Sequence, residues 1–361
     1  MSNDILFSSF RLGPITLRNR VVMAPMTRNR STGNVPGDLA VKYYAQRAEA
    51  GLIITEGTSP SPNGLGYARI PGLFNAAQAA AWKKVTDAVH GRSGRIFGQL
   101  MHTGRASHPD NLPPGAKILA PSAVALGGDG IWVDPDGNKL APAPAAMTAG
   151  EIEATIEEYV HSAELALEAG FDGVELHGAN GYLIEQFLNT ASNRREDEWG
   201  GSIPNRIRFA TEVAKRTAAR IGGDRLGIRV SPYGVFNGMT RDPATEDDVY
   251  ESLARELSTI GLVYIHVVDH SSMGAPEVKP SVKRKIRDAF KGAYILSGGY
   301  DLARAVADLT EKKGDLVSFA RPFVSNPDLV ARLRDGRALH APDFATFYTP
   351  GPKGYTDYPV D

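Results

Sequence analysis

The chain has 361 residues, of which 42% are hydrophobic and 22% charged, a composition typical of a water-soluble globular protein with a sizeable core. Its formal net charge is −1, so no electrostatic argument favours binding to DNA, RNA or an anionic membrane. The absence of cysteine excludes disulfides, thiolate metal sites, iron–sulfur clusters and thiol nucleophiles.

The N-terminal segment MSNDILFSSFRLG has neither the basic head nor the apolar run of a signal peptide. No stretch of the sequence approaches the length of apolar residues that spans a bilayer. We therefore expect a cytoplasmic protein that acts on neither nucleic acids nor membranes.

Short apolar runs alternate with helical patterns from one end of the chain to the other. Eight runs are strand candidates, at residues 20–26, 52–57, 95–100, 173–179, 226–232, 264–269, 293–299 and 316–322. Most of them are apolar on both faces, which is typical of parallel strands covered by helices. Eight strand-then-helix units predict the α/β class, a (β/α)8 TIM barrel that forms a single domain over residues 1–361. An open, doubly wound sheet of six or seven units is the structural alternative.

Several predicted helices have recognisable ends. Thr148 and Glu151 form a capping-box pattern before an apolar stripe. Thr245 is expected to open a helix that Gly261 stops. Asn326 is expected to cap a helix with Pro327 at its first position, and Gly336 to end it.

Three segments fall outside the repeat. Residues 1–19 are expected to form an N-terminal hairpin that closes the bottom of the barrel, with a turn near Gly13 and Pro14. Residues 101–147, rich in Pro and Gly, form a long excursion after the third strand, and residues 340–361 form a tail. An excursion of that length on the loop side of a barrel is more often a lid or pocket wall than a linker.

Reactive groups of a TIM barrel lie at the carboxyl ends of its strands. Ser297-Gly298-Gly299 follows the seventh strand, and Arg321 follows the eighth. Glycines let backbone N–H groups approach an anion at a helix N-terminus, and a guanidinium neutralises it. The pattern indicates a phosphate site; two ordinary tight turns and a surface arginine are the structural alternative.

His177, Asn180 and Tyr182 lie at or just past the end of the fourth strand, in HGANGYL. A histidine and an asparagine can together donate two hydrogen bonds to one substrate oxygen, and a nearby phenol can deliver a proton. Each residue alone is more often structural, but their grouping at the rim favours function.

Arg229 is a cation inside an otherwise apolar strand, so it requires a partner. A structural ion pair and a contact with a cofactor are equally open at this point.

The stretches RVVMAPMTRNR, ITEGT, FGQLMHTGR, HGANGYLIEQFLN, GIRVSP, LSGGY, FARPFVSNPDL and the closing GYTDYP occur in this order. In order and spacing the chain resembles the Old Yellow Enzyme family from about residue 5 to residue 359. Thr27, where another branch has cysteine, is typical of the threonine-bearing bacterial branch.

The resemblance implies a non-covalent FMN and an NAD(P)H-dependent ene-reductase. It assigns Gly298, Gly299 and Arg321 to the phosphate and Thr27 to the flavin carbonyl beside N5. Further implied roles are Gln99 and Arg229 at the pyrimidine edge, Pro25 and Gly57 against the ring, His177 and Asn180 at the substrate carbonyl, Tyr182 as proton donor, and Tyr67, Met101 and Tyr348 as pocket walls.

No G-x-G-x-x-G fingerprint follows any predicted strand, so a separate nicotinamide domain is not expected. The implied scheme is ping-pong: NADPH or NADH reduces FMN and leaves, and N5 then gives hydride to the β-carbon of an α,β-unsaturated carbonyl compound or nitroalkene. The expected partners are small activated alkenes, and the expected state is a monomer or homodimer.

Two positions vary from the family pattern. Met101 stands where many relatives carry tryptophan, so the substrate range is not carried over, and Asn180 stands where some carry histidine. Reduction of nitro compounds or nitrate esters on the same flavin is the alternative function. No metal is expected, because His266 and His270 lie on a strand end and loop with only Asp269 as a further ligand.

Overall fold

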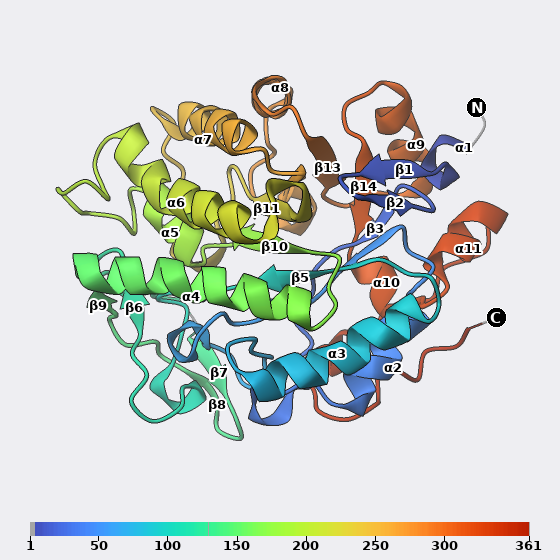
Figure 1. Cartoon of the computed structure of the whole chain (residues 1–361), viewed down its shortest axis with the longest axis horizontal. Helices are drawn as coiled ribbons and strands as arrows, with labels where there is room; N and C mark the ends of the chain where they lie inside the picture. The colour runs from blue at the N-terminus through green and yellow to red at the C-terminus, as the bar shows by residue number, and fades with distance from the viewer. Residues whose placement is uncertain (1–3, 129, 361) are drawn as a thin grey trace.

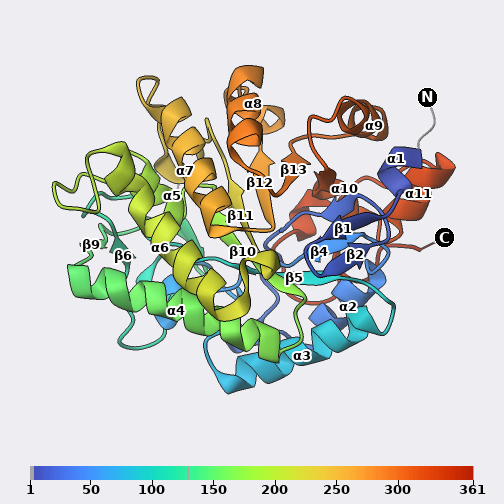
Figure 2. The same cartoon turned by 45° about the horizontal axis from the view of Figure 1, so that its top comes forward.

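The strands close into a parallel barrel with helices around it. The computed structural model describes residues 4–128 and 130–360. Its eight barrel strands are hydrogen-bonded in the closed order β10-β11-β12-β13-β14-β3-β4-β5. Each neighbouring pair is parallel, and the helices pack outside, as Figures 1 and 2 show. The predicted (β/α)8 TIM barrel is confirmed, and the open doubly wound sheet is excluded.

Each of the eight predicted apolar runs contains one barrel strand. These strands are β3 (Val21–Met23), β4 (Leu52–Ile54), β5 (Ile96–Leu100), β10 (Gly173–Gly178), β11 (Leu226–Val230), β12 (Tyr264–Val268), β13 (Ala293–Ser297) and β14 (Leu316–Phe319). Most strands end one to three residues before the predicted runs do, because the chain leaves the sheet there to form the rim.

The structure has eleven α-helices in its described residues. They are α1 (Asp4–Phe7), α2 (Asp38–Gln46), α3 (Ala76–His90), α4 (Ala149–Glu168), α5 (Leu183–Leu188), α6 (Ile203–Ile221), α7 (Glu246–Ile260), α8 (Pro280–Ala289), α9 (Leu302–Thr310), α10 (Arg321–Ser325) and α11 (Leu329–Asp335). None of the helices in the described part of the chain combines the length and the apolar character needed to cross a membrane.

The bottom of the barrel is closed by an N-terminal hairpin. Strands β1 (Phe10–Leu12) and β2 (Ile15–Leu17) pair antiparallel around Gly13, whose φ is 52°, as expected for the turn. Leu12 and Leu17 pack in one buried cluster with Phe97 and other barrel residues. The hairpin is confirmed for residues 10–17, and the short helix α1 precedes it.

Polarity changes along the barrel axis. Phe97, Tyr264 and Leu316 belong to the apolar cluster above the hairpin. Two residues further along the same strands, and therefore on the same face, stand Gln99, His266 and Ser318. Apolar packing holds the lower half together, and the upper half presents polar groups toward the rim.

The predicted ends of α4 and α7 are confirmed. Thr148 and Glu151 form a complete capping box at the start of α4. Gly261 ends α7 in the left-handed conformation, although the Thr245 hydroxyl donates to Asp242 Oδ2 instead of capping the helix.

The prediction for the last helix is wrong at its start. Helix α11 begins at Leu329 after Asp328, and Asn326 instead follows the end of the short helix α10. The Asn326 side chain donates to Pro322 O at 2.8 Å and accepts from the backbone N–H of His340 at 2.8 Å. Because it ties two segments together in this way, it is not available as a cap. Gly336 ends α11 as predicted.

The excursion and the tail lie over the rim. The excursion carries two short pairings, β6 (Leu119–Ala120) with β9 (Ala145–Ala146) and the hairpin of β7 (Ile131–Val133) with β8 (Gly137–Lys139). The tail is held by Arg30, whose guanidinium donates to carbonyls of Thr346, Phe347 and Gly351. Both segments therefore supply walls above the strand ends.

Candidate active site

A continuous groove runs across the carboxyl ends of the barrel strands. It comprises a rim cavity of about 250 Å³, a central cavity of about 390 Å³ and a vestibule of about 580 Å³. The rim and central cavities share Arg229, His270 and Arg321. The central cavity and the vestibule share Tyr182 and Tyr348. An elongated ligand could therefore lie along the groove without a break.

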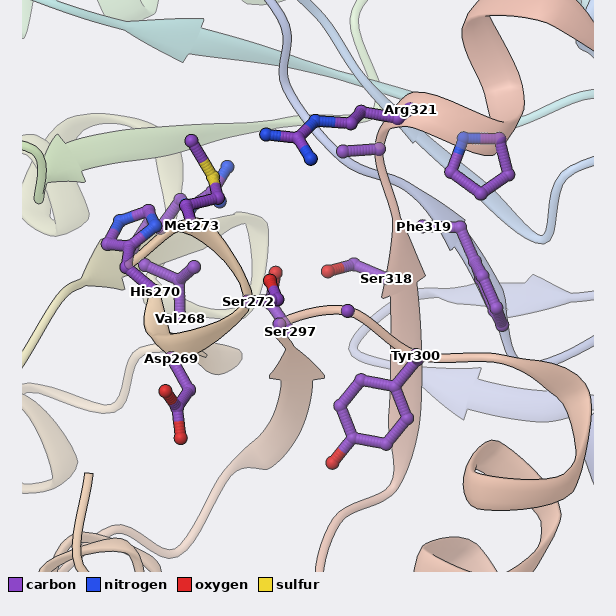
Figure 3. Close-up of a pocket in the computed structure, with 15 residues that line it drawn as sticks. Val268, Asp269, His270, Ser272, Met273, Ser297, Tyr300, Ser318, Phe319 and Arg321 are labelled. Carbon is purple, nitrogen blue, oxygen red and sulfur yellow. The ribbon is translucent and has the colours of Figure 1, made fainter. Parts of the chain in front are cut away.

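The rim cavity contains the residues for which phosphate binding is predicted. Gly298 and Gly299 have φ values of 132° and 63°, and a Cβ on Gly298 would overlap the carbonyl of Asp269. Figure 3 shows the Arg321 guanidinium above a space toward which the hydroxyls of Ser272 and Ser318 point. This combination of open backbone, hydroxyl groups and a cation suits an anion.

The helix after the glycines contributes less than the sequence suggests. Helix α9 starts only at Leu302, and the carboxylate of Asp301 already accepts from the backbone N–H of Arg304 at 2.8 Å. The N-terminus of α9 is thus capped by a negative side chain. An anion in the rim cavity would depend on the glycine backbone and Arg321 rather than on this helix.

The central cavity gathers the residues that the resemblance assigns to the flavin ring. Its lining includes Pro25, Thr27, Gly57, Gln99, Met101 and Arg229. A Cβ on Gly57 would overlap the sulfur of Met101. A larger residue at this position would therefore displace Met101, which lines the same cavity.

Arg229 reaches the central cavity as a buried cation. It is 6% exposed, and its Nε has no hydrogen-bond partner among the described residues. Burial lowers its pKa, while the nearby Glu175 carboxylate opposes that shift. Glu175 itself accepts hydrogen bonds from Gln99 Nε2 at 2.8 Å and the Tyr264 hydroxyl at 3.0 Å. Since the described part of the chain gives Arg229 no direct ion pair, the contact with a ligand is the favoured interpretation.

His177 presents a neutral donor to the central cavity. Its Nδ1 accepts from the backbone N–H of Ala179 at 3.2 Å. Burial holds the pKa of His177 well below its usual range, with a further lowering by Arg229. The neutral ring therefore carries its single proton on Nε2, the nitrogen opposite the backbone contact.

Asn180 is held from three directions. Its φ is 61°, its backbone N–H donates to Ser231 Oγ at 2.9 Å, and its carbonyl accepts from Asn237 Nδ2 at 2.8 Å. Its side-chain Oδ1 lies 2.7 Å from His270 Nε2. With Oδ1 engaged, the amide NH2 group is left for the cavity.

Tyr182 stands beside His177, with the two rings edge to face at 4.8 Å between centroids. Its hydroxyl donates to that of Tyr67 at 3.3 Å, and burial raises its pKa well above the usual value. A phenol in this setting keeps its proton at neutral pH and can act as an acid rather than as a base.

The three residues expected to line the substrate pocket occupy different parts of the groove. Met101 lines the central cavity, Tyr67 lines the vestibule, and Tyr348 lines both. The backbone of Tyr348 is held by Arg69, whose guanidinium donates to Tyr348 O and also forms an ion pair with Asp134 of the excursion. The excursion and the tail are thereby connected at the mouth of the groove.

Two contributors were missed by sequence reasoning. The sequence places His270 at the end of a strand and gives it no role, since no metal is expected there, yet it lines both the rim and central cavities and contacts Asn180. Its place directly after the end of a barrel strand was a usable signal. Trp132 of the excursion hairpin lines the vestibule, and nothing in its local sequence indicated that.

Comparisons with known proteins show the family and the fold. Residues 5–340 match the model of the NADH:flavin oxidoreductase / NADH oxidase family. A probable flavin mononucleotide-dependent alkene reductase of Leishmania infantum is 39% identical, over 99% of this chain and 98% of the relative.

Two solved structures are also similar. Morphinone reductase in complex with tetrahydroNAD superposes with a TM-score of 0.93 at 43% identity, covering 98% of this chain and 97% of the other. The old yellow enzyme homologue from Zymomonas mobilis has a TM-score of 0.94 at 39% identity, covering 98% and 99%.

Proposed function

The chain belongs to the NADH:flavin oxidoreductase / NADH oxidase family, as its resemblance to Old Yellow Enzyme indicated, and we propose how its groove reduces an activated alkene. It is an oxidoreductase, an FMN-dependent alkene reductase that takes its electrons from a nicotinamide nucleotide. The proposal concerns the residues that carry the reaction and the class of substrate.

The groove fits FMN on two observations. Gly298 and Gly299 have positive φ and lie too close to Asp269 and Ser272 to carry a Cβ, so bare backbone lines the rim cavity beside Arg321. The buried Arg229 has an Nε without a partner in the described chain. We assign the phosphate to Gly298, Gly299 and Arg321. The ring is assigned to the central cavity, beside Pro25, Thr27, Gly57, Gln99 and Arg229. FMN held by these residues would supply the hydride transfer between the nicotinamide nucleotide and the β-carbon of the alkene.

The observation that carries the substrate proposal is the pair of donors on one wall of the central cavity. His177 Nε2–H and the amide NH2 of Asn180 both remain available after their other polar atoms are engaged. Two donors directed at one oxygen stabilise the negative charge that develops there when the β-carbon receives hydride. This favours alkenes conjugated to a carbonyl or nitro group.

Tyr182 is proposed as the acid that protonates the α-carbon. Its ring packs against His177 in the central cavity, and burial keeps its hydroxyl protonated. The Tyr67 hydroxyl accepts a hydrogen bond from the Tyr182 hydroxyl. Both tyrosines line the vestibule, which connects them to solvent. A proton that Tyr182 delivers can thus be replaced from solvent.

The hydride donor and the alkene use the same groove. Both must reach the central cavity through the vestibule side, so they are expected to occupy it in turn, in a ping-pong order. A nitro group or nitrate ester could also place an oxygen on the donor pair, so such compounds belong in the test.

The test separates the two half-reactions. Holoenzyme is reduced anaerobically with NADPH or NADH and then reoxidised with a panel of enones, nitroalkenes and nitrate esters. Tyr182→Phe should slow reoxidation by a simple enone and leave reduction by the nicotinamide nucleotide intact. Equal slowing of both steps would exclude the proton-donor role, and reoxidation by nitrate esters alone would replace the alkene proposal by the alternative.

A further inference from the structure

His270 lies where the groove changes from rim cavity to central cavity. It follows β12 directly, is 6% exposed, and begins the turn Ser271–Met273. Its ring packs edge to face against Phe236, with 4.7 Å between centroids. Its Nε2 contacts one polar side-chain atom, Asn180 Oδ1, at 2.7 Å. The proposed chemistry uses Asn180 and gives His270 no role.

The contact matters because a primary amide has two unlike ends. The NH2 end of Asn180 can donate to a substrate oxygen, whereas the carbonyl end would repel it. The backbone contacts of Asn180 with Ser231 and Asn237 hold its main chain and leave the amide free to turn about its last bond. The contact between His270 Nε2 and Asn180 Oδ1 decides which end of the amide faces the cavity.

We propose that His270 is a positioning residue: by donating from Nε2–H to Asn180 Oδ1, it turns the amide NH2 of Asn180 toward the substrate oxygen. The inference rests on the proposed function, because it specifies how one member of the donor pair is oriented. It also extends the site to a residue that follows β12, two strands along the barrel from β10, which precedes Asn180.

The electrostatic surroundings keep His270 in the required form. The charged groups that face it are Arg229 and Asp269. Burial and, to a smaller extent, Arg229 lower the pKa of His270 to about 4, and Asp269 only partly opposes them. The Asp269 carboxylate is engaged by Lys283 Nζ at 2.6 Å and by the backbone N–H of Ser271 at 3.0 Å. The ring is therefore neutral at pH 7, with a single N–H that the contact assigns to Nε2.

A double-mutant cycle tests the inference on the holoenzyme. The variants are His270→Phe, Asn180→Ala and their combination, and the measurement is the dissociation constant of 4-chlorophenol from its effect on the flavin absorption spectrum. His270→Phe should weaken binding about tenfold, the effect of misdirecting one hydrogen bond to a charged oxygen. In the Asn180→Ala background the same replacement should have almost no effect, because the group through which His270 acts is gone.

Two further variants complete the design. His270→Gln retains an N–H donor and should recover most of the affinity, which a role in packing alone would not allow. His161→Phe, on the exposed face of α4, controls for the replacement itself and should match the wild type. If His270→Phe gives no folded holoenzyme, His270→Ala enters the same cycle in its place.

The outcomes are distinct. Unchanged affinity in His270→Phe would overturn the inference, and so would an equal loss with and without Asn180, since His270 would then act directly on the ligand or flavin. A wild-type protein that retains no FMN or binds no phenol would instead overturn the proposed function, and the inference with it.

Discussion

Removing the donor pair should abolish most of the affinity for an anionic oxygen. We consider the double replacement of His177 and Asn180 by alanine and the binding of a phenol, whose phenolate oxygen resembles the charge that develops on a substrate oxygen. His177 is almost fully buried, whereas Asn180 is partly exposed. His177 should therefore contribute the larger share.

The magnitude follows from the two hydrogen bonds lost. A hydrogen bond to a charged group contributes about 1.5–3 kcal/mol, so the pair contributes about 3–5 kcal/mol once the partial exposure of Asn180 is considered. That corresponds to a dissociation constant raised roughly hundredfold to several thousandfold. Since both donors are neutral, no full charge is removed, and the FMN should remain bound.

The pH dependence gives an independent check. Because burial holds the pKa of His177 well below its usual range, the ring does not titrate near neutrality. Binding should tighten as the pH rises through the pKa of the phenol itself, since the phenolate fraction grows, and no second inflection should occur near pH 6.5.

The assay is a spectral titration of oxidised holoenzyme over pH 6–9, with FMN content as the control for folding. A dissociation constant within a factor of two of the wild type in the double variant would refute the reasoning, because the oxygen would then bind elsewhere. An inflection near pH 6.5 that disappears in His177→Ala would refute the assignment of a neutral ring.

Three other replacements test separate parts of the site. Arg229→Gln removes a buried cation. If the guanidinium contacts the flavin, its loss should lower the two-electron potential of bound FMN by on the order of 60–90 mV in an anaerobic dye titration. An unchanged potential would place the cation away from the flavin. Gly298→Ala should raise the dissociation constant of FMN at least about tenfold. Gly261→Ala is the control, because Gly261 also has a positive φ, 88°, but no neighbour within 4 Å, and it should leave the constant unchanged. Equal constants in the two variants would exclude the glycine turn as the phosphate site. Burial raises the pKa of Glu185 to about 7. Between about pH 4.5 and 7 the native state therefore keeps a proton that the unfolded state has lost. The free energy of unfolding should fall as the pH rises through this range, by on the order of 3 kcal/mol from this group. Glu185→Gln should flatten that slope in urea unfolding, and an unaltered slope would show that another group causes it.

The sequence predicted the barrel because its signals are local. Apolar runs, the capping box at Thr148 and the stop at Gly261 depend on neighbours a few residues away, and the structure contains all three. The rim residues could also be selected, since a TIM barrel brings the ends of its strands together whatever lies between them. The site residues that the resemblance implied all lie along the groove.

Where a side chain's partner is distant in sequence, the local pattern was insufficient. Asn326 has the appearance of a helix cap, but the segment that returns at His340 takes up its amide. Arg229 could equally have had a structural partner, and only the folded barrel shows that Glu175 is already engaged by Gln99 and Tyr264.

By itself the sequence determined the architecture of this protein and the residue types that gather along the groove, among them the glycine turn and arginine proposed to bind phosphate. Periodicity, turn chemistry and strand-end position are encoded by near neighbours. The tertiary structure alone decided which atoms of those residues face a ligand. The proton of His177 and the amide of Asn180 are oriented by single hydrogen bonds, and the second of these joins residues 90 positions apart. No spacing along the chain specifies such a contact, since it exists only once the barrel has closed.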